Sequence, residues 1–167
     1  MNAVATFAYA RTHSATFVSD KMRNLLKVLV RDHGLDPQKL VDAWSDWVDR
    51  AVRTWIETGD LVEIVVEFYW PGSTNAVGRW DFPIRYDGNG GDEMWVDRDY
   101  MTESFAKAER PPLGCLYRVV LVTKEGRPDV PGVGPTTLRS VNGLVAREFG
   151  TVISTPDIMA SARYYRR

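Results

Sequence analysis

A turn-rich stretch, GRPDVPGVGPTTLRSVNG (residues 126–143), limits the folds open to this chain more than any other feature. Prolines at 128, 131 and 135 keep it out of helices, and four glycines let it turn sharply. Apolar residues then resume at Leu144 and continue almost to the end of the chain. A long stretch without core residues inside a compact domain is typically functional or disordered. Because structured sequence follows it, we interpret this stretch as a crossing loop.

The apolar run CLYRVVLVTK (residues 115–124) precedes that loop and has high β-propensity. If this strand ends its sheet, its unpaired backbone groups need a cover or a partner. An extended peptide can fill that place as an added strand, with alternating pockets giving specificity. Residues 136–141 and 144–154 are strand-like again. We therefore expect the loop to carry them past the edge strand to the far side of the sheet and to enclose a bound peptide.

The other elements alternate too irregularly for a parallel α/β fold. The pattern predicts a strand over 4–11, a helix over 12–33 with Thr12 or Ser14 as its cap, a helix from Asp36 to Gly59, strands over 61–70 and 78–86, and a helix from Asp97 or Asp99 to Pro111. Clustered helices favour an α+β fold with helices on one face of a largely antiparallel sheet. At 167 residues, the chain is expected to form one domain, 1–167.

Composition excludes several classes of protein. A net charge of −1 gives no electrostatic attraction to nucleic acid or to an anionic membrane. One cysteine excludes an internal disulfide framework and favours a reducing compartment. The N-terminus lacks a signal-peptide pattern, and no apolar run reaches membrane-spanning length. These observations predict a soluble cytoplasmic protein.

Catalytic and metal-binding patterns are weak. Cys115 is interpreted as a small buried group, and His13 as a capping or packing residue. Glu63 and Glu67 lie on the polar side of a strand, where they are expected to face arginines in solvent. The loop from Asp87 fails the calcium-loop pattern, and residues 132–134 lack the rest of a phosphate loop. We expect no cofactor, no metal and no enzymatic activity; a hydrolase using His13 with Asp20 or Glu63 is a minor rival.

Four blocks carry a specific resemblance: ARTHSATFVSDKMRNLLKVLVRDHGLDP, AVRTWIETGDL, RWDFPIRYDGNG and above all GRPDVPGVGPTTLRS. They resemble the bacterial HORMA-domain proteins that accompany nucleotidyltransferases in cyclic-oligonucleotide antiphage systems, and the similarity covers essentially the whole chain. The resemblance implies three helices packed on a mainly antiparallel sheet, with a C-terminal safety belt that closes over a short partner peptide, the closure motif. It divides the chain into an N-terminal segment (1–11), a core (12–124) and the belt (125–167).

The resemblance also implies site residues. The peptide-binding edge strand would comprise Leu116, Tyr117, Arg118, Val119, Val120, Leu121 and Val122. The safety belt would include Arg127, Pro128, Val130, Leu138, Val141, Val145, Phe149 and Val152. The N-terminal strand, Asn2 to Arg11 with Val4, Phe7 and Tyr9, would be engaged by a remodelling ATPase.

The function implied is a peptide-binding switch. The closed, peptide-bound state would bind and activate a nucleotidyltransferase that makes a cyclic-oligonucleotide messenger, and an AAA+ ATPase would reopen it. The belt and the N-terminal strand would compete for sheet positions, and the peptide would shift the population by its preference for the closed state. Since no extension follows Arg167, the closure-motif peptide is expected in trans. The alternative is a constitutive scaffold that joins two proteins without switching.

Overall fold

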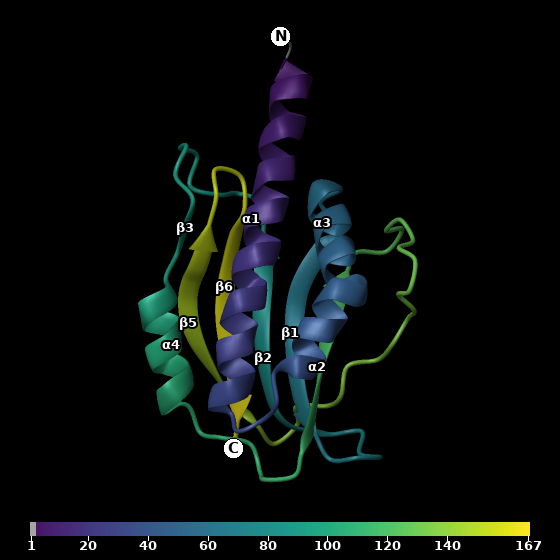
Figure 1. The fold of residues 1–167 in the computed structure, drawn as a ribbon, viewed down its shortest axis with the longest axis vertical. Helices are drawn as coiled ribbons and strands as arrows, with labels where there is room; N and C mark the ends of the chain where they lie inside the picture. The colour runs from purple at the N-terminus through teal and green to yellow at the C-terminus, as the bar shows by residue number, and fades with distance from the viewer. Residues whose placement is uncertain (1–2) are drawn as a thin grey trace.

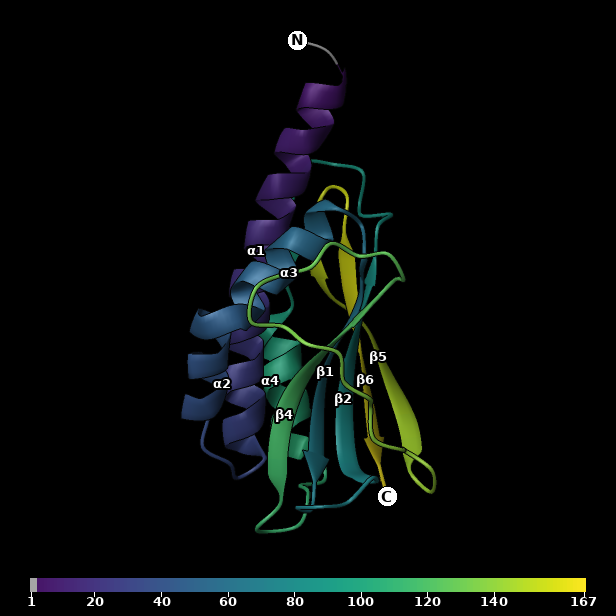
Figure 2. The ribbon, with the colours of Figure 1, turned by 90° about the vertical axis from the view of Figure 1, so that its right-hand side faces the viewer.

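Two layers make up the molecule, with helices covering one face of a single sheet (Figures 1 and 2). The computed structural model describes the backbone of residues 3–167 and the side chains of residues 10–167. Within that part of the chain the sheet has six strands in the order β3-β5-β6-β2-β1-β4, and every neighbouring pair is antiparallel. The predicted α+β class, with three helical segments on an antiparallel sheet, is confirmed.

The helical layer consists of one long helix, one interrupted helix and one short helix. Its elements are α1 (Ala3–Asp32), then α2 (Gln38–Ala43), the π-helical turn η1 (Trp44–Val48) and α3 (Asp49–Glu57) in continuous succession, and α4 (Arg98–Lys107). The interrupted helix spans Gln38–Glu57, slightly inside the predicted ends at Asp36 and Gly59. The amide of Gln38 donates to Asp36 Oδ1 at 2.9 Å, and Gly59 ends the helix with a left-handed φ of 78°.

The N-terminal segment is helical, so the predicted strand over residues 4–11 is wrong. A short apolar run does not distinguish a strand from a helix, and alanines at 3, 5, 8 and 10 favour the helix. Thr12 and Ser14, predicted as caps, consequently lie inside α1. Ser14 is buried and hydrogen-bonds to the carboxylate of Asp157. Asn2, in the predicted N-terminal segment, lies outside the described residues.

The strands confirm most of the pattern read from the sequence. They are β1 (Leu61–Tyr69), β2 (Ala76–Arg85), β3 (Trp95–Val96), β4 (Leu116–Thr123), β5 (Val145–Ser154) and β6 (Met159–Arg166). The predicted strands 61–70 and 78–86 correspond to β1 and β2, which pair antiparallel, and β4 lies at one edge of the sheet as expected. Residues 136–141 differ from the prediction, because they form only one isolated bridge, between Asn75 and Ser140.

The loop from β4 to β5, residues 124–144, is called the belt loop from here on. It passes beside α3, crosses the face of the sheet opposite the helices and reaches β5 (Figure 2). It thereby carries β5 and β6 to the far side of β2, as expected. These strands complete the core, since Val152, Ile153 and Tyr164 are almost fully buried.

The helices cover one face of β1 and β4, and the belt loop lies over part of the other face. Ile64, Val66 and Phe68 of β1 belong to the core beneath the helices. The opposite, outer face carries Glu67, which was expected to be solvated, and this expectation is wrong because Glu67 is 0% exposed. The cause is the belt loop, which lies over this part of the outer face and contacts the Glu67 carboxylate through Arg139.

Candidate functional site

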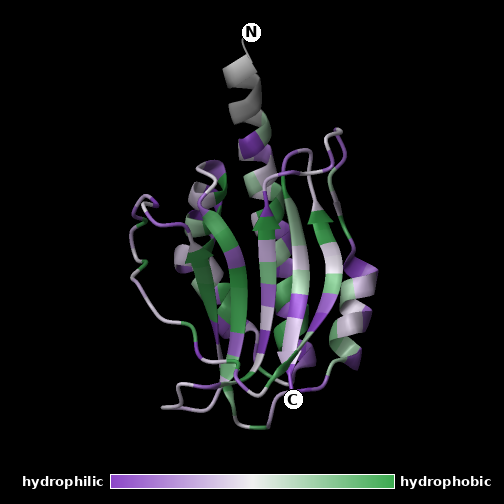
Figure 3. Cartoon of the chain, turned by 180° about the vertical axis from the view of Figure 1, so that it is seen from behind, coloured by the Kyte–Doolittle hydropathy of each residue, from purple (hydrophilic) through white to green (hydrophobic). Residues whose placement is uncertain are grey.

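A groove of about 640 Å³ lies between β4 and the belt loop. One wall is β4 from Val119 onward with the turn that follows it, and the other is the belt loop at residues 133–138. Trp47 and Trp55 of the interrupted helix close the side facing the helical layer. Viewed from behind, β4 appears mainly hydrophobic along its length beside this loop (Figure 3). The two segments singled out in the sequence therefore form one site.

The backbone edge of β4 faces this groove. Within the described chain β4 pairs with β1 alone, over Leu116 to Thr123, so its other edge has no strand partner. Such an edge presents a row of amide and carbonyl groups that an extended chain can pair with. The groove therefore offers backbone hydrogen bonds along one wall.

The side of the groove nearest the helices is apolar. Val119 and Leu121 pack partly buried against the core, as do Trp47 and Val133. Side chains of an added strand alternate between the two faces of the sheet. Every second residue of a strand placed here would therefore meet this apolar wall.

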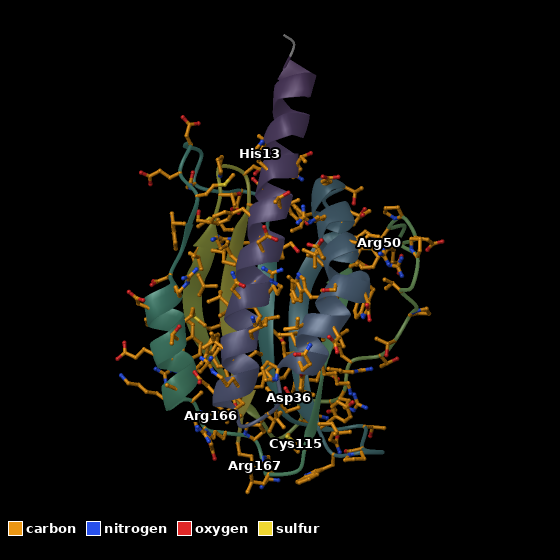
Figure 4. All side chains as sticks on the ribbon, in the orientation of Figure 1. His13, Asp36, Arg50, Cys115, Arg166 and Arg167 are labelled. Atoms are coloured by element: carbon orange, nitrogen blue, oxygen red, sulfur yellow. The ribbon has the colours of Figure 1, made fainter. Side chains whose placement is uncertain are left out.

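The belt loop is fixed at its N-terminal end by a first anchor on α3. The indole Nε1 of Trp55 donates to the carbonyl oxygen of Pro128 at 2.8 Å, and the Arg127 guanidinium lies 4.5 Å from the indole centroid. Val130 is buried in the core. Arg50, which projects from α3 toward the loop in Figure 4, donates to the carbonyl oxygen of Pro131 at 2.9 Å.

A second anchor holds the C-terminal half of the loop on the outer face of the sheet. The carboxylate of Glu67 accepts hydrogen bonds from Arg118 Nε at 2.8 Å, from the amide of Arg139 at 2.7 Å and from Arg139 Nη1 at 3.0 Å. Arg118 also donates to Thr136 Oγ1 at 2.9 Å and to the carbonyl of Thr137 at 2.6 Å. One buried carboxylate thus joins β1, β4 and the belt loop.

Backbone contacts extend this second anchor toward the β1–β2 turn. The amide of Ser140 donates to the carbonyl of Thr74 at 2.9 Å, and the amide of Ala76 donates to the carbonyl of Ser140 at 2.8 Å. The guanidinium of Arg139 lies 3.5 Å from the ring centroid of Tyr69. The groove therefore lies under a short span, residues 132–135, between two fixed points.

The predicted edge-strand residues divide into two groups. Val119, Val120, Leu121 and Val122 line the groove. Leu116, Tyr117 and Arg118 lie outside its lining. Tyr117 is buried, where its hydroxyl donates to the carbonyl of Asp36 at 2.7 Å and accepts from the amide of Leu40 at 2.9 Å.

The predicted belt residues are spread over the loop and β5. Arg127 and Leu138 line the groove, and Pro128 and Val130 belong to the first anchor. Val141 is half-buried, whereas Val145 is 63% exposed at the start of β5. Phe149 and Val152 pack against the core from β5.

The N-terminal residues Val4, Phe7 and Tyr9 have helical backbones within α1, and their side chains lie outside the described part.

Glu67, Trp47 and Trp55 are the site residues that sequence reasoning missed. Trp55 is 1% exposed and belongs to the core, yet its indole N–H reaches the belt loop. Glu67 carried one usable signal. In the register it lies opposite an arginine on each neighbouring strand, Arg79 on β2 and Arg118 on β4.

Two reactive side chains, Cys115 and His33, are buried. Burial raises the pKa of the Cys115 thiol, which opposes its ionisation. Burial, with a further contribution from Arg110, lowers the pKa of His33 to about 4, and its Nε2 accepts from the Trp80 indole at 3.0 Å.

The rival hydrolase hypothesis pairs His13 with Asp20 or Glu63. His13 and Asp20 are seven residues apart in α1, about 10 Å along its axis. Asp20 instead pairs with Arg53 at 3.4 Å. For Glu63, burial and the nearby Asp81 raise the pKa, and its partner Arg163 lies 3.9 Å away. Residues 3–167 contain no cluster of three His, Cys, Asp or Glu side chains suited to a metal, and no helix long and apolar enough for a membrane.

Taken together, the two-layer fold, the crossing belt loop and the open β4 edge define a HORMA-type domain. The family model described as Bacterial HORMA domain 2 matches residues 1–167, so the chain belongs to this family. No curated protein matches the chain in sequence.

Solved structures share the fold at low sequence identity. A chain of the mitotic checkpoint complex has a TM-score of 0.70 at 10% identity, covering 94% of this chain and 96% of that one. The HORMA:CdnC:Trip13 complex of E. coli MS115-1 gives 0.62 at 12% identity, covering 93% and 89%. C. elegans HTP-2 bound to the HIM-3 closure motif gives 0.62 at 13% identity, covering 96% and 90%.

Proposed function

We propose that this protein captures an extended peptide, its closure motif, as an added strand on the free edge of β4, beneath the belt loop. The observation that carries the proposal is the coincidence of an unpaired backbone edge with an apolar groove closed over by an anchored loop. The backbone would supply affinity, and the wall formed with Val119, Leu121 and Trp47 would select apolar side chains at alternate positions. Solved relatives of the fold bound to closure motifs support this mode.

The belt loop makes the groove a candidate for switching. A chain lying beneath residues 132–135 is enclosed between the two anchors, so exchange of peptide requires part of the loop to move. A peptide that binds the closed arrangement alone would favour it in proportion to its differential affinity. The division into N-terminal segment, core and belt belongs to this proposal, with the helical start of α1 in place of the expected strand.

The partners follow from the family. We propose that the peptide-bound form binds and activates a nucleotidyltransferase producing a cyclic oligonucleotide in antiphage defence, and that an AAA+ ATPase resets it through residues 1–11. The support is the E. coli HORMA protein of similar fold in a complex with CdnC and Trip13. The protein itself would act without catalysis, in the cytoplasm, with neither membrane nor nucleic acid as a partner.

A constitutive scaffold is the second candidate. The belt loop is held by two anchors with many hydrogen bonds, which favours a single loop conformation. In a scaffold, the hydrogen bonds of both anchors would persist, and the belt loop would keep one conformation with and without a partner. A switch would show faster backbone exchange in the loop when peptide is absent.

Peptide display on the full-length chain tests the function. Gly134 lines the groove, and a Cβ placed there meets nothing within 4 Å, so we expect Gly134→Trp to obstruct the groove while the fold is kept. Gly91→Trp is the matched control in a distant loop. We expect the unmodified chain and Gly91→Trp to enrich one peptide consensus and Gly134→Trp to lose it. Equal enrichment by all three would place peptide binding elsewhere.

Shortening the chain after Lys124 is not a usable alternative. It would remove β5 and β6, which contribute Val152, Ile153 and Tyr164 to the core. A loss of binding in such a chain would report unfolding.

A further inference from the structure

The side chain of Glu67 is 0% exposed and is bonded to two arginines. One arginine, Arg118, lies on the neighbouring strand β4, and the other, Arg139, lies in the belt loop. Within the described residues neither arginine has a second acidic partner. The three groups therefore form a closed charge network between sheet and loop.

The network changes when the belt loop lifts from the sheet. Arg139 would leave with the loop and remove both its amide and its guanidinium from Glu67, so two of the three hydrogen bonds would be lost. Arg118 would lose Thr136 and Thr137 in the same movement. A buried carboxylate deprived of its donors is strongly disfavoured. Lifting the belt loop from the sheet at Arg139 is therefore opposed by the loss of a charged pair as well as by the loss of neutral hydrogen bonds.

The first anchor has no buried carboxylate among the contacts described above. Trp55 and Arg50 donate to the carbonyl oxygens of Pro128 and Pro131, and carbonyl acceptors bind less strongly than carboxylates. Arg127 has an acidic partner, Asp129, at 3.4 Å, but Asp129 is fully exposed to solvent. The two ends of the span over the groove are thus held unequally.

We propose that Glu67 is a positioning residue that latches the belt loop, holding residues 136–140 on the outer face of β1 and β4. The latch sets how often the groove opens at that end and, resting on the proposed function, how long a captured peptide stays. Glu67 is not part of the groove lining, so it would act through Arg118 and Arg139.

Hydrogen exchange of the full-length chain without peptide tests the latch. Glu67→Gln keeps the shape of the side chain but leaves two arginines without a counter-charge. Arg139→Met removes the guanidinium contact from the loop side. It leaves the Glu67–Arg118 pair and the amide of residue 139 in place, so it is the variant better suited to fold. Glu63→Gln is the matched control, since Glu63 lies on the same strand but has arginine contacts no closer than 3.9 Å.

The expected result is exchange about 30-fold faster in residues 136–144 for Glu67→Gln and Arg139→Met. Exchange in β2 and β6 should stay unchanged, and Glu63→Gln should match the unmodified chain. A merely structural role would speed exchange throughout the sheet, and that result, or no local change in either variant, overturns the latch.

A second measurement ties the latch to peptide capture. With the peptide most enriched by display, Glu67→Gln should dissociate about 10-fold faster at a nearly unchanged association rate. An unchanged dissociation rate overturns the regulatory part of the inference. If display enriches no peptide, the proposed function fails, while the exchange measurement still decides whether Glu67 latches the loop.

Discussion

The indole N–H of Trp55 donates to the carbonyl oxygen of Pro128 at 2.8 Å, joining α3 to the belt loop 73 residues further along the chain. The guanidinium of Arg127 covers the same ring. A buried tryptophan thus serves both the core and the loop.

Trp55→Phe tests this first anchor. Phenylalanine retains an aromatic side chain but removes the donor to Pro128, so we expect a loss of about 1 kcal/mol in the free energy of unfolding. Limited proteolysis should show faster cleavage within residues 126–135. Trp44→Phe is the control, because it also removes a buried indole donor, whose acceptor at 3.2 Å is Ser19 of α1 and not a residue of the belt loop. Equal cleavage in the two variants would contradict the anchor.

Tyr117 is expected to support the fold without contacting peptide. Tyr117→Phe leaves the amide of Leu40 and the carbonyl of Asp36 without the hydroxyl. We expect a loss of about 1–3 kcal/mol in the free energy of unfolding by urea titration. Affinity for a display-selected peptide should stay within twofold. Tyr100→Phe, at a side chain 43% exposed, is the neutral control. A large fall in peptide affinity at unchanged stability would put Tyr117 in the groove instead.

His33 predicts a pH dependence of stability. Its pKa is lowered from 6.5 to about 4 in the folded chain, mainly because burial disfavours the imidazolium. Above pH 6.5 both states hold the neutral ring, and below it the unfolded state takes up a proton first. Stability should therefore fall as the pH drops from 6.5 toward 4, by about 3 kcal/mol, and this contribution should level off below pH 4.

Urea titrations at pH 7 and pH 4.5 check this prediction. His33→Gln retains an acceptor for Trp80 but does not titrate, so its stability should change less over that interval. His13→Gln, at an exposed position, should behave as the unmodified chain. The same loss in all three proteins would assign the pH dependence to other groups.

Much of the fold could be predicted from short-range sequence patterns. Asp36 and Gly59 mark the ends of the interrupted helix, and the period-two pattern marks β1 and β2. The edge position of β4 was expected because this apolar strand is followed directly by the proline- and glycine-rich stretch 126–143. The groove was expected for the same reason, since a bare edge needs a cover.

The errors concern features decided by distant contacts. The first turns of α1 contain an apolar, aromatic run compatible with either state, and continuation into a long amphipathic helix decides between them. Glu67 was placed in solvent because its strand alternates, but burial depends on what lies over that face, which is set by Arg139, 72 residues away. The role of Trp55 depends on the path of the same loop.

The central claim is that β4 receives an extended peptide through its backbone. Its most direct test is an N-methyl scan of the peptide that display enriches most, with each backbone amide methylated in turn and affinity measured for the full-length chain. An added strand points alternate amides toward β4, so binding should be lost at every second position within the paired segment and retained at the positions between. Uniform tolerance, or sensitivity without that alternation, would contradict pairing with β4.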